Sequence, residues 1–220
     1  MRAAPGTLAV WSDIGCAWSH AVIWRLWDAR RRLGLVERVR FDHHAFPLEL
    51  FNNEPTPRAR IEAEWPIARI LAPRAGWQAW TAPPDTYPVT MLPALEAVQA
   101  AKLGSLAAAE ELDRGLRRAF FAESRCISLR HVILEGASTC ESLDMDRFVA
   151  DYDAGLGRRP LFDDWATART DAVRGSVHVF APDGTNDQNP GITIAWDGSA
   201  YAVASDDLSA VEDLVRRASG

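Results

Sequence analysis

The alternation of hydrophobic and polar residues predicts the elements of the N-terminal part. Residues 7–12 form a short apolar run that suits a buried strand. The stretch 17–33 repeats apolar residues at roughly helical spacing, and Gly34 follows it as a helix stop. Residues 36–46 then alternate apolar and polar side chains, as a strand does. Because strand, helix and strand follow one another directly, the pattern predicts a βαβ unit.

The middle of the chain is predicted to be helical. Eight prolines between residues 47 and 88 favour loops and short helices over one long helix. From Thr90 onwards the apolar periodicity becomes strongly helical, and Thr90 and Asp144 are placed as caps. The expected helices cover residues 90–104, 106–124, 128–137 and 144–155.

The C-terminal part returns to strands. A helix over 159–175 leads into a β-rich run, and residues 191–205 contain a strand, an Asp-Gly turn and a further strand. A final amphipathic helix follows, with Ser205 or Asp206 as its cap. The order βαβ, helical block, ββα predicts an α/β thioredoxin fold with a large helical insertion. The thioredoxin-like domain would comprise residues 1–46 and 159–220, and the insertion residues 47–158.

Composition and charge narrow the range of partners. The 220 residues carry 30 acidic and 24 basic side chains, which gives a net charge of −6. Nucleic acids and anionic membranes are therefore not expected as main partners, because binding phosphates requires a basic face. The first residues lack the apolar core of an export signal, and no stretch approaches the ~20 apolar residues that span a bilayer. We expect a cytoplasmic protein.

Of the three cysteines, Cys16 is the candidate for a reactive thiol. Cys16, Cys126 and Cys140 are too few for a disulfide framework and lack paired metal-ligand spacing, so no metal site is expected. Cys16 lies in "VWSDIGCAWSHAV", where the first strand ends and the first helix begins. The amides and dipole at a helix N-terminus favour negative charge, which predicts a lowered pKa and a reactive thiolate at Cys16.

The position that would complete a Cys-x-x-Cys pair is occupied by Ser19. The Ser19 hydroxyl could donate a hydrogen bond to the Cys16 sulfur, but it cannot release a mixed disulfide by internal attack. A site with one thiol would depend on glutathione or another low-molecular-weight thiol as co-substrate. His20, next in the chain, would add to thiolate character if it were protonated.

Four segments resemble the DsbA-like thioredoxin family. They are "VWSDIGCAWSHAV", "HHAFPLEL", "LRRAFFAES" and "GSVHVFAPDGTNDQNPGI", and they follow the order of that family along most of the chain. Within that family, the chain resembles the branch that contains FrnE-type proteins, 2-hydroxychromene-2-carboxylate isomerases and kappa-class glutathione transferases. The resemblance implies the thioredoxin fold, and it is compatible with disulfide exchange and with glutathione-dependent isomerisation or transfer.

The resemblance also implies the substrate-binding residues. Trp18 would flank the thiol, Ser176 and Val177 would occupy the loop facing it, and Ser205 and Asp206 would correspond to a Ser-Asp pair that holds glutathione in kappa-class enzymes. Relatives usually have a cis-proline where this chain has Val177. Since a cis bond before a non-proline residue costs ~2.5–4 kcal/mol, a trans peptide or a remodelled loop is expected.

Three hypotheses follow from the sequence. The first is a thiol–disulfide oxidoreductase that uses Cys16 as its nucleophile and Ser19 beside it, acting on a small thiol or on a peptide or protein disulfide. The second is a glutathione-dependent isomerase or transferase, in which Cys16 or Ser19 activates glutathione. The third is a thioredoxin-like scaffold that binds a partner without catalysis. The oligomeric state is left open.

Overall fold

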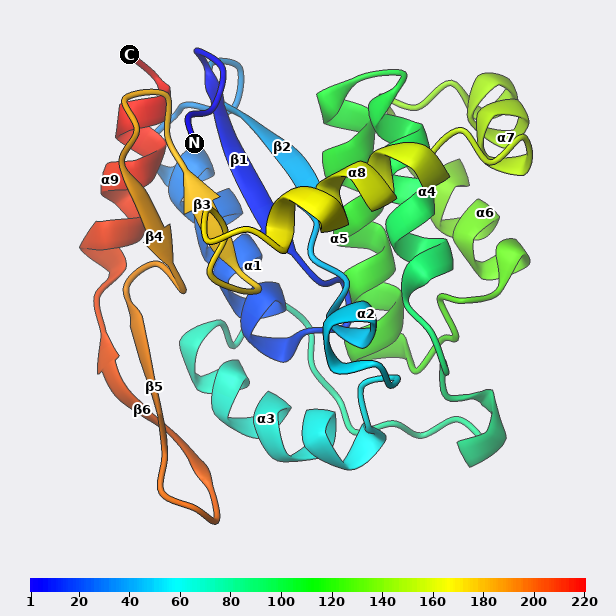
Figure 1. Cartoon of the computed structure of the whole chain (residues 1–220), viewed down its shortest axis with the longest axis horizontal. Helices are drawn as coiled ribbons and strands as arrows, with labels where there is room; N and C mark the ends of the chain where they lie inside the picture. Colours follow the sequence, from blue (N-terminus) through cyan, green and yellow to red (C-terminus); the bar gives the residue numbers. More distant parts are fainter.

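The computed structural model describes all 220 residues and has the mixed α/β architecture that the sequence predicts (Figure 1). Every element between the second and third strands is helical. In chain order the elements are β1 (Thr7–Ser12), α1 (Ala17–Arg32), β2 (Arg40–Ala45), α2 (Leu48–Asn52), α3 (Arg58–Leu71), the 3₁₀ turn η1 (Pro84–Thr86), α4 (Leu92–Lys102), α5 (Leu106–Glu123), α6 (Arg130–Ser138), α7 (Met145–Asp153), α8 (Arg158–Ala168), β3 (His178–Phe180), β4 (Asn186–Gln188), β5 (Ile192–Trp196), β6 (Tyr201–Asp206) and α9 (Leu208–Ala218).

The main sheet has the strand order β2-β1-β3-β4, so β1 lies inside it. β1 pairs in parallel with β2, and Val10 lies opposite His43. On its other side β1 pairs antiparallel with β3, where Val10 lies opposite Val179. Parallel neighbours require a crossover, and α1 provides it, which confirms the predicted βαβ unit. β5 and β6 form a separate antiparallel hairpin.

Helices cover both faces of β2 because its side chains alternate between them. On one face the Phe41 ring packs beneath the Arg30 guanidinium of α1, and the Phe41 amide donates to Glu110 of α5 at 2.6 Å. On the opposite face His44 bonds to Asp164 of α8 at 2.7 Å. Figure 1 shows α8 crossing in front of the sheet, with α1 behind it. α9 packs against α1 and β1.

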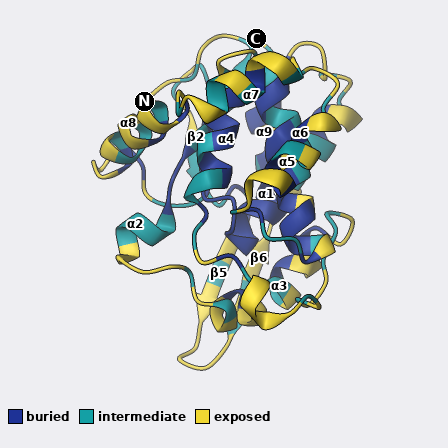
Figure 2. Cartoon of the chain, turned by 90° about the vertical axis from the view of Figure 1, so that its right-hand side faces the viewer, coloured by how far each residue is buried: buried dark blue, intermediate teal, exposed yellow.

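A single cluster of 46 buried residues joins the sheet to the helical block. Figure 2 shows that burial is deepest along α1, α4 and α5, whereas the β5–β6 hairpin is largely exposed. None of the helices combines the length and apolar character that crossing a bilayer requires.

The helices α4 to α7 begin and end close to the predicted positions, and the Asp144 carboxylate caps α7 by accepting from the Arg147 amide at 3.1 Å. The prediction for the proline-rich segment is wrong in one respect: α3 is a 14-residue helix that contains Pro66. A proline removes one amide donor from a helix, and packing against α1 and β6 stabilises α3 despite that loss. The predicted helix over 159–175 ends earlier, at Ala168.

Candidate active site at the first strand–helix turn

Cys16 is the N-cap residue of α1, as the sequence predicts. Its backbone is extended, with φ −80° and ψ 121°, and its carbonyl accepts the first helical hydrogen bond, from the His20 amide at 3.0 Å. A Cβ on Gly15, the preceding residue, would lie 2.7 Å from the terminal methyl of Met91, so a larger residue here would require that side chain to shift. The turn that presents the thiol therefore packs closely against the residue that precedes α4.

A buried carboxylate organises this turn. Asp13 accepts from the Gly15 amide at 2.7 Å and from the Leu48 amide at 2.8 Å, so it ties the turn to the start of α2. Burial raises the pKa of Asp13 to about 6, although the two amides and the Arg117 charge oppose that rise. Asp13 is not among the residues predicted from the sequence, although an acidic residue inside a strand–helix turn is a signal that the sequence contains.

Arg117 of α5 is hydrogen-bonded to the same turn. It donates to the carbonyls of Asp13 and Ile14 at 3.0 and 3.3 Å and to the Ser12 hydroxyl at 2.9 Å. Its charge is balanced by Asp113, one helical turn earlier, at 2.8 Å. Both members of this ion pair are buried, and Arg117 was not predicted as part of the site.

The loop before β3 lies against the thiol turn. The Ser176 hydroxyl accepts from the Asp13 amide at 2.8 Å and is 2.6 Å from the Ser19 hydroxyl, and the Ser176 carbonyl oxygen is 3.9 Å from the Cys16 sulfur. The structure thus brings Ser19 and Ser176, two of the residues predicted for the site, together beside Cys16.

The peptide bond between Ser176 and Val177 is cis, so the expected trans peptide or remodelled loop is wrong. The expectation considered only the intrinsic cost of a cis bond. In the structure, the Ser176 hydroxyl is held by two partners of the thiol turn and the Val177 side chain is fully buried, so tertiary contacts define the backbone of this loop.

The thiol itself differs from the expected thiolate. Cys16 is only 5% exposed, and burial raises the pKa of its thiol, with the Glu64 carboxylate raising it further. Hydrogen bonds from Ser19 lower the pKa, but by less than burial raises it. The helix N-terminus was predicted to dominate; desolvation dominates instead, because Cys16 is part of the main cluster of buried residues.

The side chains around the thiol are apolar or already paired. Trp18 is 6% exposed and contacts Tyr201 of β6 edge to face, with ring centroids 5.9 Å apart. Glu64 is buried in α3 and accepts from Arg60 at 3.0 Å. Trp18 thus belongs to the packed wall of the site, and the charge of Glu64 is balanced by Arg60.

His20 does not act as a cation beside the thiol. Its ring stacks on Phe121 with centroids 4.6 Å apart, meets Trp77 edge to face, and bonds to the Gly76 carbonyl oxygen at 3.2 Å. Burial lowers the pKa of His20 to about 3, so the ring is neutral at physiological pH. The suggestion that a protonated His20 promotes the thiolate is therefore wrong.

Ser205 and Asp206 do not cap the last helix; Asp207 does, by accepting from the Ser209 amide at 2.9 Å. The prediction of Ser205 or Asp206 was two residues or one residue early, because β6 continues through Asp206 in its pairing with β5. The Ser205 hydroxyl donates to Thr193 at 2.7 Å, and Asp206 forms an ion pair with the buried Arg25 of α1. Both side chains are therefore already engaged within the protein.

The remaining cysteines are free: Cys126 and Cys140 are partly buried and form no disulfide. No group of three or more histidine, cysteine or acidic side chains is placed to hold a metal ion. Chemically, the site offers one buried thiol, a serine one helical turn away and a backbone loop facing both.

No protein-family model matches the chain, and no curated protein matches it in sequence. Solved structures do match. The cytosolic disulfide reductase DsbM from Pseudomonas aeruginosa is 17% identical, with a TM-score of 0.66 over 96% of this chain and 95% of its own. That protein has also been solved with GSH, where the likeness has a TM-score of 0.65 over 96% of each chain at 16% identity.

A 2-hydroxychromene-2-carboxylate isomerase is similar over a smaller part: it is 12% identical, with a TM-score of 0.56 over 79% of this chain and 84% of its own. At these identities the likeness concerns the fold. The chain has the architecture of DsbA-like thioredoxin-fold proteins, which confirms the fold class and the fold resemblance derived from the sequence.

Proposed function

We propose that the protein is a thiol–disulfide oxidoreductase in which Cys16 is the single nucleophile. The observation that carries the proposal is the position of the Cys16 sulfur, at the N-terminus of α1 and 3.9 Å from the Ser176 carbonyl of the opposing loop. The fold shared with a disulfide reductase supports it. We further propose that the activity is cytoplasmic.

The reaction requires an external thiol, and we propose glutathione or a similar small thiol. The Cys16 thiolate attacks one sulfur of a mixed disulfide, forms a new disulfide with it and releases the other sulfur as a thiolate. Glutathione thiolate then attacks the sulfur of the group bound to Cys16. This releases the Cys16 thiolate, and glutathione and the group leave together as a new disulfide. One disulfide is consumed and one is formed, so no further oxidant or reductant is needed.

The resting thiol must be uncovered before it reacts. Burial and the Glu64 carboxylate of α3 are the two largest effects that raise the pKa of Cys16, and the Asp13 carboxylate of the thiol turn raises it further. The Ser19 hydrogen bonds and the helix N-terminus, which favour the thiolate, belong to α1 itself. Displacement of α3 by a substrate would therefore remove the Glu64 charge from the thiol and leave the activating contributions of α1 in place.

The test is the release of glutathione from a glutathionylated peptide, with glutathione as the reductant. We expect the wild-type protein to accelerate release, Cys16→Ala to abolish the acceleration, and Cys126→Ala to retain it as a matched control. Loss of one thiol at the attack step removes covalent catalysis altogether. Equal rates for the wild type and Cys16→Ala would refute the proposal.

A glutathione-dependent isomerase is the second candidate, favoured by the fold that the chain shares with a 2-hydroxychromene-2-carboxylate isomerase. In this case Ser205 and Asp206 would bind glutathione after release from Thr193 and Arg25. Calorimetry distinguishes the two candidates. The isomerase requires that glutathione binds and that its affinity is lower in Asp206→Asn. If glutathione does not bind and Cys16 stays unreactive, the scaffold hypothesis remains.

A further inference from the structure

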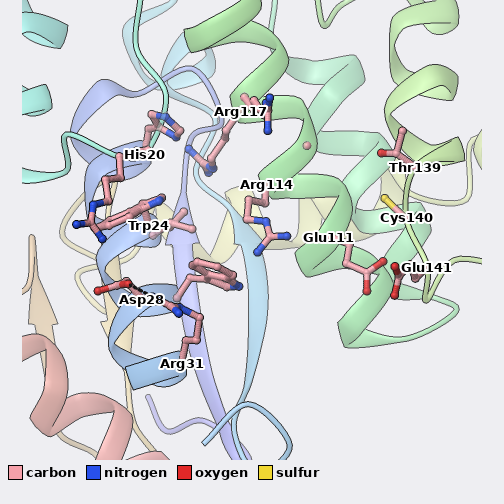
Figure 3. Close-up of a pocket in the computed structure, with 16 residues that line it drawn as sticks. His20, Trp24, Asp28, Arg31, Glu111, Arg114, Arg117, Thr139, Cys140 and Glu141 are labelled. Carbon is pink, nitrogen blue, oxygen red and sulfur yellow. Dashed lines mark hydrogen bonds and ion pairs between the residues drawn. The ribbon is translucent and has the colours of Figure 1, made fainter. Parts of the chain in front are cut away.

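A groove of about 780 Å³ lies between α1 and α5, away from the thiol. Figure 3 shows its two sides: Trp24 and Asp28 belong to α1, and Arg114 and Arg117 belong to α5 across from them. Thr139 and Cys140, at the end of α6, border the groove farther along. The volume lies within the range of sites that take small organic ligands. Neither Cys16, Ser19 nor Ser176 lines it.

One arginine in the groove is held in place without a carboxylate. The Arg114 guanidinium lies over the Trp27 ring, 4.5 Å from its centroid. It makes no ion pair and no hydrogen bond, so its N–H groups have no acceptor in the protein. Stacking on an indole fixes the plane of a guanidinium and leaves its edge free, and that edge matches a carboxylate with two parallel hydrogen bonds.

Most other charged side chains of the groove, unlike Arg114, already have partners within the protein. Arg31 pairs with Asp28 at 3.2 Å and Arg118 with Glu123 at 2.9 Å, so neither is available for a ligand. Among the acids, Glu111 accepts from the amide and hydroxyl of Ser142 at 2.9 and 2.7 Å, and none of its interactions involves Arg114. Such pairing leaves few free charges in the groove.

Arg74, at the loop that follows α3, is the second cation without a partner. Glu111 and Glu141 line the groove without a cation partner, and Glu141 lies beside Cys140 at the side formed by the end of α6. The lining still carries five arginines against three carboxylates, which makes the groove locally attractive to an anion in a protein of net charge −6.

Aromatic surface accompanies these cations. Trp24 and Trp27 both line the groove from α1, and both are only partly buried. The Trp27 ring already lies under Arg114 and Arg31, so Trp24 is the indole that offers flat apolar surface to a ligand. A ligand that satisfies both features carries a negative group for Arg114 and a planar apolar body for Trp24.

We propose that this groove binds a planar organic anion. Its carboxylate pairs with Arg114, with Arg74 adding attraction, and its flat body lies along Trp24. The site is separate from the thiol site, so the proposal does not depend on the chemistry of Cys16.

Calorimetry on the full chain tests it, with 2-naphthoate as the probe and 2-naphthylmethanol as the neutral control of the same shape. We expect 2-naphthoate to bind with a sub-millimolar dissociation constant and the alcohol to bind about tenfold more weakly, because only the acid can pair with Arg114. Equal affinity for the two, or no binding of 2-naphthoate up to about 5 mM, would contradict the proposal.

Variants then locate the site. Arg114→Gln should weaken 2-naphthoate binding about tenfold, and Arg159→Gln, on the exposed side of α8, should leave it unchanged. Arg114 is exposed, so the variant is expected to fold, which thermal unfolding verifies. Cys16→Ala should bind like the wild type. Unchanged affinity in Arg114→Gln, or lost affinity in Cys16→Ala, would place the ligand elsewhere and overturn the assignment.

Discussion

The thiol turn and the groove between α1 and α5 treat polar groups in opposite ways. At the thiol turn, Asp13 and Arg117 are buried, and each is satisfied by several partners. Along the groove, Arg74 and Arg114 have no partner and are exposed. A buried charge must be paired because desolvation is costly, whereas an exposed one can stay free for a ligand. The comparison shows that the thiol turn is built for rigidity and the groove for access.

The largest effect expected at the thiol turn comes from Arg117→Met. The substitution leaves Asp113 charged and buried without its partner, and it removes the donors to the carbonyls of Asp13 and Ile14. Breaking a buried pair in this way costs about 3–5 kcal/mol, so the free energy of unfolding in urea should fall by that amount.

The neighbouring arginine is the control. Arg118→Met removes an exposed ion pair with Glu123 and should change stability by less than about 1 kcal/mol. If the two substitutions had equal effects, the contrast between the buried and the exposed arginine would be wrong.

The second largest effect is a fall in the free energy of unfolding at acidic pH, caused by protonation of His20 in the unfolded chain. Burial lowers the pKa of His20 to about 3, below the ordinary value of 6.5, so the unfolded chain takes up this proton more readily than the folded one. The contribution of neutral His20 to the free energy of unfolding is therefore fully present above pH 6.5 and is lost as the pH falls towards 3. At pH 5 the free energy of unfolding should be about 2 kcal/mol lower on account of His20.

His20→Phe isolates this effect. A phenyl ring can keep the stack on Phe121 but cannot be protonated. Urea unfolding at several pH values should show that the variant loses less stability than the wild type between pH 7 and 5. Parallel curves for the two proteins would show that His20 is not the group responsible. Asp13, whose pKa is raised to about 6, contributes in the opposite sense and is present in both.

The smallest effect is on thiol reactivity. Glu64→Gln removes a negative charge that raises the pKa of Cys16, so the alkylation of Cys16 by iodoacetamide should reach half its maximal rate at a lower pH. Peptide mass spectrometry gives the rate for this cysteine alone. Glu62→Gln, in the same helix but exposed and paired with Arg58, should leave the profile unchanged. A shift in the control and none in Glu64→Gln would exclude Glu64 as the cause.

Much of the fold was predictable from local signals. The apolar run of β1, the glycine after α1 and the Asp144 cap of α7 are each defined within one turn or strand, and the structure contains all three. α3 was missed because its stability comes from packing against α1 and β6, which outweighs the Pro66 in its sequence. The cap of α9 was misplaced because strand pairing, and not side-chain preference, determined where β6 ends.

By itself the sequence determined that Cys16 begins a helix after a buried strand, with Ser19 one turn later, because chain connectivity and helix periodicity establish that proximity. Only the tertiary structure decided what surrounds the thiol. Ser176 is 157 residues from Ser19 in sequence, yet their hydroxyls are 2.6 Å apart. Glu64, from another helix, helps to raise the pKa of the thiol. Desolvation and charge act through space, so they depend on which distant segments pack together.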